Sequence, residues 1–166
     1  TNEINGFVYD FATGGFTSAN VAGESTRQGV ELALAFAPTE RLRFNATYTY
    51  LDADQQDSFG KAVTEVRRPK HSGSISANYA WSDAGLHFAV SHTGTQEDDF
   101  FPPFPPFIER VELDAFTLVS LSGFYKLNSK VTLTGTLENL ADDDYEQVFG
   151  FESPGFGGYL GIRVAW

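Results

Sequence analysis

The sequence contains neither cysteine nor methionine. Without cysteine, a disulfide framework and a thiolate metal site are both excluded. A reading frame begins with methionine, and residues 1–6 show neither the basic region nor the apolar region of a signal peptide. We therefore expect that the chain begins inside a longer product, which was processed or truncated.

Long hydrophobic runs and basic residues are also scarce. No stretch approaches the roughly 18 consecutive apolar residues that a transmembrane helix requires, so only strands could cross a membrane. The net charge of -11 argues against a nucleic-acid partner, because such binding needs clusters of Lys and Arg. An acidic chain is equally typical of a soluble protein, but the aromatic content of 15% is high for a chain without long apolar runs.

Apolar and polar residues alternate along most of the chain. In residues 42–51, Phe44, Tyr48 and Tyr50 share one parity, and Arg, Asn and Thr occupy the other. This period of two predicts a strand with one apolar and one polar face. The same alternation occurs in residues 29–36, 72–81, 131–138 and 158–166, and more weakly in residues 86–91. The phase of residues 116–125 stays uncertain because they are partly apolar on both faces, and residues 4–11 form a short, ambiguous eighth segment.

The composition of the two faces favours a membrane wall over a soluble sandwich. A solvated sandwich face usually carries Lys and Glu, whereas the polar face here is mostly Ser, Thr, Asn, Gly and Ala, as in a lumen. The apolar face carries Tyr or Trp near the ends of the strands, where a headgroup girdle would lie. These residues are Tyr48, Tyr50, Tyr79, Trp81, Tyr125 and Trp166.

Short and long connections alternate without exception. Tight turns at residues 38–40, 82–85 and 126–129 separate the long links at residues 12–26, 53–65, 94–112 and 141–156. This alternation is typical of an outer-membrane barrel, with short periplasmic turns and long extracellular loops. We predict an all-β fold, an antiparallel transmembrane β-barrel of about eight strands, whose last strand places Leu160, Ile162, Val164 and Trp166 toward lipid with Trp166 on the periplasmic side.

Four motifs occur in an order and spacing that resemble the C-terminal part of TonB-dependent outer-membrane transporters. They are a G-V-E segment in residues 27–32 (RQGVEL), a strand end in residues 48–52 (YTYLD), a basic strand opening in residues 67–71 (RRPKH) and an N-L-x-D-x-x-Y-type run in residues 138–145 (ENLADDDY). Residues 4–10, 13–14 and 145–150 also resemble cobalamin receptors. The chain departs from the family at Trp166, where the family usually ends in Phe, and this change keeps the aromatic character.

The resemblance implies that residues 1–166 are the C-terminal segment of a 22-stranded barrel around a plug, in the outer membrane of a Gram-negative bacterium. The whole protein would actively transport a scarce, bulky nutrient such as siderophore-iron, haem or cobalamin. Its partners would be the rest of the receptor (plug and earlier strands), the TonB complex through the absent N-terminal part, outer-membrane lipid and lipopolysaccharide, and the barrel-assembly machinery that reads the last strand. Eight strands alone would leave two unpaired edges, which lipid cannot satisfy.

No catalytic set, cofactor site or metal site is expected. The three histidines His71, His87 and His92 have no metal-site spacing, and His87 and His92 fall on opposite strand faces. No nucleophile motif occurs. Residues 52–57 fail the EF-hand pattern, so we read them as a solvated loop. The alternative is a loose calcium contact, or cross-linking to lipopolysaccharide through divalent ions. We read residues 142–144 likewise as an exposed acidic turn.

The candidate ligand site is a Phe- and Pro-rich segment at residues 97–108. Its four prolines favour an extended chain, and its four Phe rings are unusual in a solvated loop. One interpretation is that the rings pack on neighbouring loops or cap the barrel mouth. The other is that they form an apolar entry site for the substrate, joined by the last loop. The candidate residues are Phe100, Phe101, Phe104, Phe107, Phe149 and Phe151.

Two other functions stay open on the sequence. A free-standing eight-stranded barrel could serve as an anchor or adhesin, and a signal peptide directly before Thr1 would favour it. A soluble β-sandwich could bind carbohydrate through its aromatic loops, and a folded, monodisperse protein without detergent would favour that.

Overall fold

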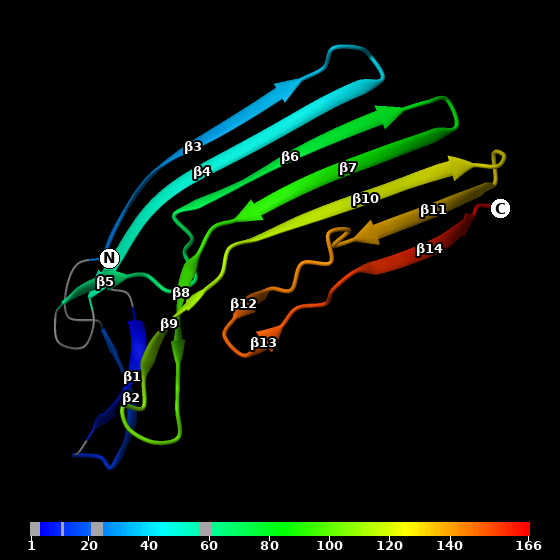
Figure 1. Cartoon of the computed structure of the whole chain (residues 1–166). Coiled ribbons are helices and arrows are strands. Elements are labelled where there is room, and N and C mark those ends of the chain that lie inside the picture. The colour runs from blue at the N-terminus through cyan, green and yellow to red at the C-terminus, as the bar shows by residue number, and fades with distance from the viewer. Residues whose placement is uncertain (1–3, 11, 21–24, 57–60) are drawn as a thin grey trace.

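A computed structural model describes residues 4–10, 12–20, 25–56 and 61–166. The regular elements in these residues are strands, and within them no helix has the length and apolar character to cross a bilayer. Seven long strands form one antiparallel sheet, which we call the wall, in the order β14-β11-β10-β7-β6-β4-β3 (Figure 1). Their bounds are β3 Thr26–Phe36, β4 Leu42–Gln56, β6 His71–Ala80, β7 Ala84–Thr93, β10 Phe116–Lys126, β11 Val131–Glu138 and β14 Gly157–Val164.

Pairing register places the apolar parity of every wall strand on one face. Directly paired residues share a face of a sheet, so the partners can be followed across the wall. One such row is apolar throughout: Leu34, Ala46, Ile75, Val90 and Val119. The row beside it is small or polar: Ala35, Asn45, Ser76, Ala89 and Ser120. The predicted alternation is thereby confirmed.

The same register gives the phase of residues 116–125, which the sequence left open. Tyr125 pairs with Leu133, and Leu121 pairs with Leu137, so both belong to the apolar face. Phe124 pairs with Thr134 on the polar face. Strand β10 is therefore apolar on both faces because Phe116, Leu118 and Phe124 add apolar side chains to the polar face.

The apolar face has no second sheet packed on it among the described residues. Ile75, in the middle of the wall, is 60% exposed, and the buried apolar residues of the described chain are only Ala53, Leu113 and Phe116. Figure 1 shows a single curved sheet. A sandwich would bury this face in a dry core, so the soluble β-sandwich interpretation is wrong.

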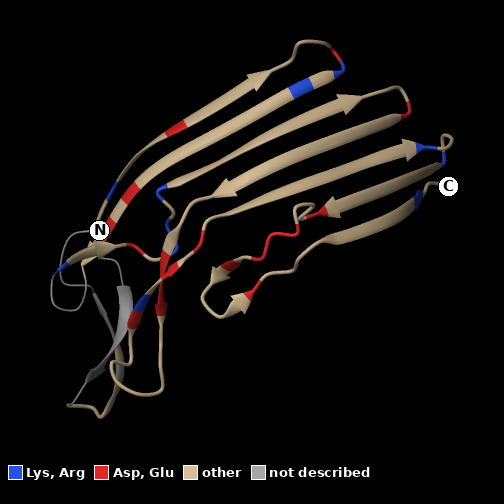
Figure 2. Ribbon diagram, in the orientation of Figure 1, with Lys and Arg blue, Asp and Glu red and all other residues tan. Residues whose placement is uncertain are grey.

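The two ends of the wall differ as the connections predicted. The short turns and the C-terminus lie at one end, the short-turn end, and the long links lie at the other, which we call the mouth (Figure 1). Figure 2 shows Asp and Glu gathered mainly at the mouth, with the strand centres almost free of charge. A band of uncharged strand between two charged ends is what a membrane wall requires.

The long links are more ordered than loops. Strand β4 continues to Gln56 and pairs with β5 (Ala62–Thr64), so residues 52–56 are strand and the solvated-loop interpretation is wrong for them, while Asp57 lies outside the described residues. The link from β7 to β10 contains the hairpin of β8 (Gln96–Phe100) and β9 (Glu109–Leu113). The link from β11 to β14 contains β12 (Glu146–Val148) and β13 (Phe151–Glu152).

Two predictions about the ends of the chain need correction. The segment at residues 4–11 is not an eighth wall strand, because β1 (Ile4–Asp10) pairs with β2 (Gly15–Asn20) in a separate two-stranded sheet, while Phe11 lies outside the described residues. Strand β14 ends at Val164, so Trp166 lies beyond the last pairing and is fully exposed. Strands β3 and β14 are the edges of a sheet that does not close within the described residues.

The wall predicts a sharp difference between adjacent positions on β6. Ile75→Arg places a charge at the middle of the apolar face, and such a change costs about 2–4 kcal/mol in lipid. Ser76→Arg places the same charge on the polar face. It should cost less than about 1 kcal/mol, because substitutions at surface positions usually change the free energy of unfolding by only about 0.5 kcal/mol. Unfolding of the receptor in lipid vesicles, followed by heat-modifiable gel mobility, measures both. Equal costs at the two positions would contradict the assignment of faces.

Candidate ligand-binding mouth

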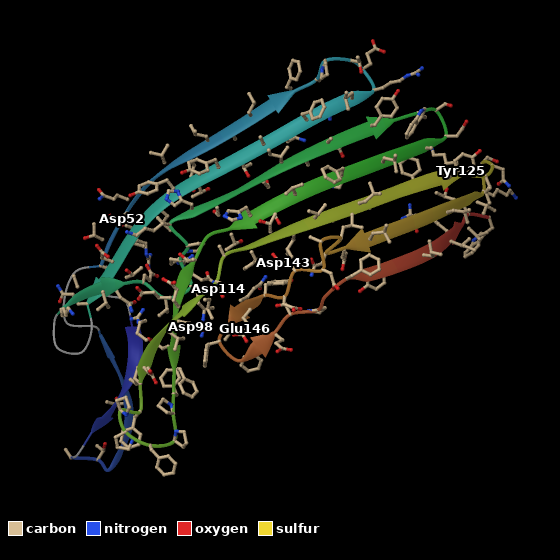
Figure 3. The ribbon with its side chains drawn as sticks, viewed as in Figure 1. Asp52, Asp98, Asp114, Tyr125, Asp143 and Glu146 are labelled. Carbon is tan, nitrogen blue, oxygen red and sulfur yellow. The ribbon has the colours of Figure 1, made fainter. Side chains whose placement is uncertain are left out.

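Three links that are distant in sequence meet at the carboxylate of Asp98 on β8. Asp98 Oδ1 accepts hydrogen bonds from Arg67 Nε and from the Asp99 amide, each at 2.9 Å, and Oδ2 accepts one from the Phe149 amide at 2.9 Å. The side chain is 1% exposed. Figure 3 labels Asp98 near Glu146 at the mouth. The β5–β6 link, the β8–β9 hairpin and the β12–β13 hairpin are therefore held together by one buried acid.

The charge of Asp98 is stabilised by this environment. Burial raises the pKa of its carboxyl, but the hydrogen bonds from the Phe149 and Asp99 amides and from Arg67, with the Arg67 charge, outweigh burial and hold the pKa below its usual value. A buried carboxylate with three donors is satisfied rather than strained. Asp98 is thus an ionised structural centre of the mouth.

Further polar contacts fix the base of the β8–β9 hairpin. The Arg67 amide donates to Glu97 O at 2.7 Å. Arg110 lies 3.1 Å from Asp99 and 3.3 Å from Glu97, and its Nη1 donates to Thr64 O at 2.9 Å. The hairpin is consequently attached to β5 as well as to the β5–β6 link.

The Arg27–Glu65 pair explains two of the motifs in the sequence. Arg27 donates twice to Glu65, at 2.7 and 2.9 Å, and these bonds with the nearby Arg68 lower the pKa of Glu65 although burial raises it. Gly29 is required because a Cβ there would collide with Tyr50 O on β4. The G-V-E segment and the basic strand opening therefore join the edge strand β3 to the mouth.

The run of residues 139–143 forms a built turn. The buried Asn139 donates to Asp143 O at 2.9 Å and to Pro154 O at 3.4 Å, and accepts from the Asp143 amide at 3.1 Å. Asp142 accepts from the Phe156 amide at 2.7 Å, and Asp143 from the Thr117 amide at 3.0 Å. The interpretation as an exposed acidic turn is thus incomplete: Asp142 and Asp144 are exposed, but two of the three acids cap the backbone of other segments.

The candidate Phe residues separate into two groups. Phe100 and Phe149 contact each other, with ring centroids 5.1 Å apart, and keep exposed fractions of 37% and 38%. The others are largely exposed, Phe104 at 75%. The most exposed members of the set are Phe101, Phe104, Phe107 and Phe151. We call residues 101–108 the aromatic tip; it projects from the end of the β8–β9 hairpin.

The histidines lie where the register places them, His87 on the polar face and both His71 and His92 on the apolar face. His87 faces the polar side and lies 2.8 Å from Asn78 Oδ1, whereas His92 lies on the apolar face and contacts Thr117 Oγ1 at 2.9 Å. Asp52, from the calcium-loop candidate, pairs with Lys70 at 3.3 Å. Over the described residues, no group of three or more His, Cys, Asp or Glu is arranged to hold a metal ion.

Nothing in the sequence marks Asp98 as the centre of the mouth. Its partners lie 31 and 51 residues away, and the surrounding acids at positions 97 and 99 look the same in the sequence. The basic pair Arg67 and Arg68 was visible, but not its acidic partners. A further unpredicted feature is a hollow of about 700 Å³ on the polar face toward the short-turn end, next to Arg43, Asn78 and His87.

Comparisons with known proteins agree on one family. Residues 1–140 match the family model "TonB dependent receptor-like, beta-barrel". The chain is 32% identical over 131 residues to the metal-pseudopaline receptor CntO of Pseudomonas aeruginosa, covering 75% of this chain and 18% of the relative. It is 30% identical over 143 residues to the vitamin B12 transporter BtuB of Vibrio cholerae, covering 86% of this chain and 22% of the relative.

Solved structures show the same fold. The pyoverdine outer membrane receptor FpvA of P. aeruginosa PAO1, bound to pyoverdine, aligns with a TM-score of 0.74 at 16% identity over 95% of this chain and 23% of that one. The siderophore receptor PirA of Acinetobacter baumannii aligns with a TM-score of 0.70 at 14% identity, covering 97% of this chain and 26% of that one.

The predicted fold class and outer-membrane location are confirmed by these matches. The chain spans about a fifth of the length of the curated relatives. It belongs to the TonB-dependent receptor-like β-barrel family of the Gram-negative outer membrane.

Proposed function

We propose that residues 1–166 form the C-terminal wall and part of the mouth of a TonB-dependent transporter that imports a scarce, bulky metal chelate. One observation carries this function: a wall with a small-polar face toward one side ends in a mouth whose links are joined at Asp98. A wall with a polar inner face can enclose a path for a substrate, and a mouth whose links are held together can present a surface that binds it. The whole residue range acts as a single barrel segment.

The substrate class follows from the relatives and from the exposed rings. The relatives and solved structures are described as a metal-pseudopaline receptor, a vitamin B12 transporter and a pyoverdine receptor. Metal complexes of this kind present large, partly apolar surfaces. The exposed rings of the aromatic tip and of Phe151 offer matching apolar contacts, and the candidates remain siderophore-iron, haem and cobalamin.

The wall performs no bond chemistry, and the proposal includes no enzymatic activity. The plug and the earlier strands complete the barrel and bind the remaining surface of the substrate. Energy reaches the plug through the TonB complex, which contacts a part of the receptor outside these residues. Outer-membrane lipid and lipopolysaccharide surround the apolar face, and open strand edges of the kind seen at β3 and β14 require further strands for pairing.

The aromatic tip gives the first test. Phe104→Ser with Phe107→Ser, made together in the full receptor, should weaken chelate binding at least about tenfold, because aromatic anchors at an interface commonly contribute more than about 1 kcal/mol each. Binding to ferric siderophore, haem and cobalamin is measured by fluorescence quenching.

The matched control replaces the same two residues by Leu. Leu keeps an apolar surface and should restore part of the affinity lost with Ser. Unchanged affinity in the Ser variant for a chelate that the receptor binds would refute the role of the tip and leave the wall assignment intact.

Asp98 gives the second test. Asp98→Asn removes the charge that accepts three hydrogen bonds, and hydrogen bonds to charged groups contribute about 1.5–3 kcal/mol each. We expect amide exchange at Phe149 and Asp99 to become at least about tenfold faster, as measured by hydrogen–deuterium exchange. The exposed Asp114 has the matched change, Asp114→Asn, which should leave both amides protected.

The pH dependence of the mouth follows from the lowered pKa of Asp98. Its stabilisation is complete above the unfolded value of about 3.9 and is lost as the pH falls through the lower folded pKa. Protection factors at Phe149 and Asp99 should therefore drop in strong acid in the native protein. The Asp98→Asn variant should show no such step, and a step of equal size in that variant would assign the effect to another group.

The last strand gives the third test, on the proposed assembly signal Leu160, Ile162, Val164 and Trp166. Trp166→Phe should keep the amount of folded receptor in the outer membrane near the native level, whereas Trp166→Ser should lower it severalfold, because an aromatic end is what the assembly machinery is proposed to read. Quantitative blotting of outer-membrane fractions measures both variants. Equal levels for Phe and Ser would remove Trp166 from the signal.

A further inference from the structure

A groove crosses the apolar face of the wall above Gly73. It measures about 600 Å³ and is bordered by residues of four adjacent strands, β3, β4, β6 and β7. A Cβ at Gly73 would lie 2.7 Å from Thr47 O, so the backbone of β4 keeps this position free of a side chain. The apolar borders are Leu32, Leu34, Ala46, Ile75 and Val90. The groove is therefore a fixed feature of the register.

The mouth side of the groove is polar. Tyr48 and His92 border the groove directly. Tyr48 Oη lies 2.8 Å from His71 Nδ1, and His92 Nδ1 lies 2.9 Å from Thr117 Oγ1. The Tyr48 and Tyr50 rings pack on His71, with centroids 6.2 and 5.3 Å away. The apolar groove thus ends at the exposed imidazole of His92, with a second exposed imidazole, His71, beside it on Tyr48.

This polar end coincides with the upper boundary of the apolar band. On the same face, the residues that follow the band toward the mouth are Gln28, Asp52, His71, His92 and Thr117. In a membrane this is the level of the lipid headgroups. The groove therefore runs from the acyl region to the headgroup region.

Both printed contacts use Nδ1, so Nε2 is the nitrogen that each histidine offers to a ligand. When the Tyr48 hydroxyl donates to His71 Nδ1, the ring proton is on Nε2, and the same holds for Thr117 and His92. His92 pairs with Gly73, so His71 and His92 are diagonal neighbours, about 7–8 Å apart at Cα. The two imidazoles are therefore near enough on one face for both to approach one phosphate group.

We propose that this groove is a specific site for lipopolysaccharide, with an acyl chain over Gly73 and a lipid A phosphate between His71 and His92. The inference rests on the proposed placement of the wall in the outer membrane, and adds a defined lipid site to it. Asp52 is the acidic residue at this level of the apolar face. Its negative charge is paired with Lys70, next to His71, at 3.3 Å, which reduces its repulsion of a phosphate.

A second groove on the same face provides a contrast. It measures about 450 Å³ and lies above the directly paired Gly123 and Gly135. No histidine or charged residue borders it. This second groove takes acyl chains without headgroup selection, which makes the two imidazoles the distinguishing feature of the first.

The decisive experiment uses the native full receptor, stripped of lipid and examined by native mass spectrometry. Titration with bisphosphorylated lipid A should give one copy bound about tenfold more tightly than lipid A whose phosphates have been removed, as expected for the loss of charge-assisted hydrogen bonds. Equal binding of the two lipids overturns the proposal. This comparison needs no variant, so it stands even if a substitution prevents folding.

Two variants then locate the site. His71→Phe with His92→Phe keeps the rings but removes the donors, and should abolish the preference for phosphate. Ala46→Phe fills the groove from an apolar position and should lower lipid A binding about tenfold. The matched control Ala77→Phe lies on the same face outside the groove and should bind as the native protein does. Loss of binding in the control, or full binding in the filled groove, places the lipid elsewhere and overturns the inference.

Uptake of metal chelate by cells that carry the native receptor separates this inference from the proposed function. If the receptor prefers phosphorylated lipid A but the cells take up no chelate, the transport function is refuted and the lipid site stands. If the cells take up chelate but the receptor binds lipid A equally with and without phosphates, the lipid site is refuted and the transport function stands.

Discussion

Backbone hydrogen bonding between strands is the constraint on which the rest of this structure depends. In a bilayer no water satisfies a free N–H or C=O group, so each wall strand must pair on both sides. Continuous pairing from β3 to β14 fixes a single register, and that register alone decides which side chains meet lipid and which meet the lumen. Leu34 and Ile75 share a face because their backbones are linked through Ala46, although they lie 41 residues apart.

The mouth obeys a different rule, since its segments lie outside the wall ladder and are bonded through side chains. Asp98 accepts hydrogen bonds from two other links, through Arg67 and Phe149, and one from the adjacent Asp99 amide. Asn139 plays a similar part at the end of β11, where it holds the turn of the last link. Such centres fix loops while leaving their outer residues free to vary. The exposed Phe104 and Phe107 lie outside these centres, so the proposed ligand surface is separate from the contacts that hold the mouth together.

Sequence reasoning was reliable where a local period carries the information. The parity of Phe44, Tyr48 and Ile75 is visible within a few residues, so the faces, the alternation of links and the fold class were all predictable. The failures concern pairing over long separations: β1 pairs with β2 instead of joining the wall, and residues 52–56 extend β4. Asp98 could not be found because its partners lie on other links and nothing local distinguishes it from Asp99.

Glycine connects the wall constraint to the lipid surface. A strand position with no room for a Cβ must be Gly, and Gly73 meets this condition against Thr47 O. The same close backbone approach that secures pairing leaves a hollow among larger apolar neighbours, so a groove on the apolar face is a consequence of register. Whether such a hollow selects one lipid then depends on its polar end. Above Gly123 and Gly135 the borders offer no charged or imidazole group, whereas above Gly73 two histidines are oriented by Tyr48 and Thr117. The proposed selectivity therefore rests on a few hydrogen bonds at the edge of a surface that is otherwise apolar.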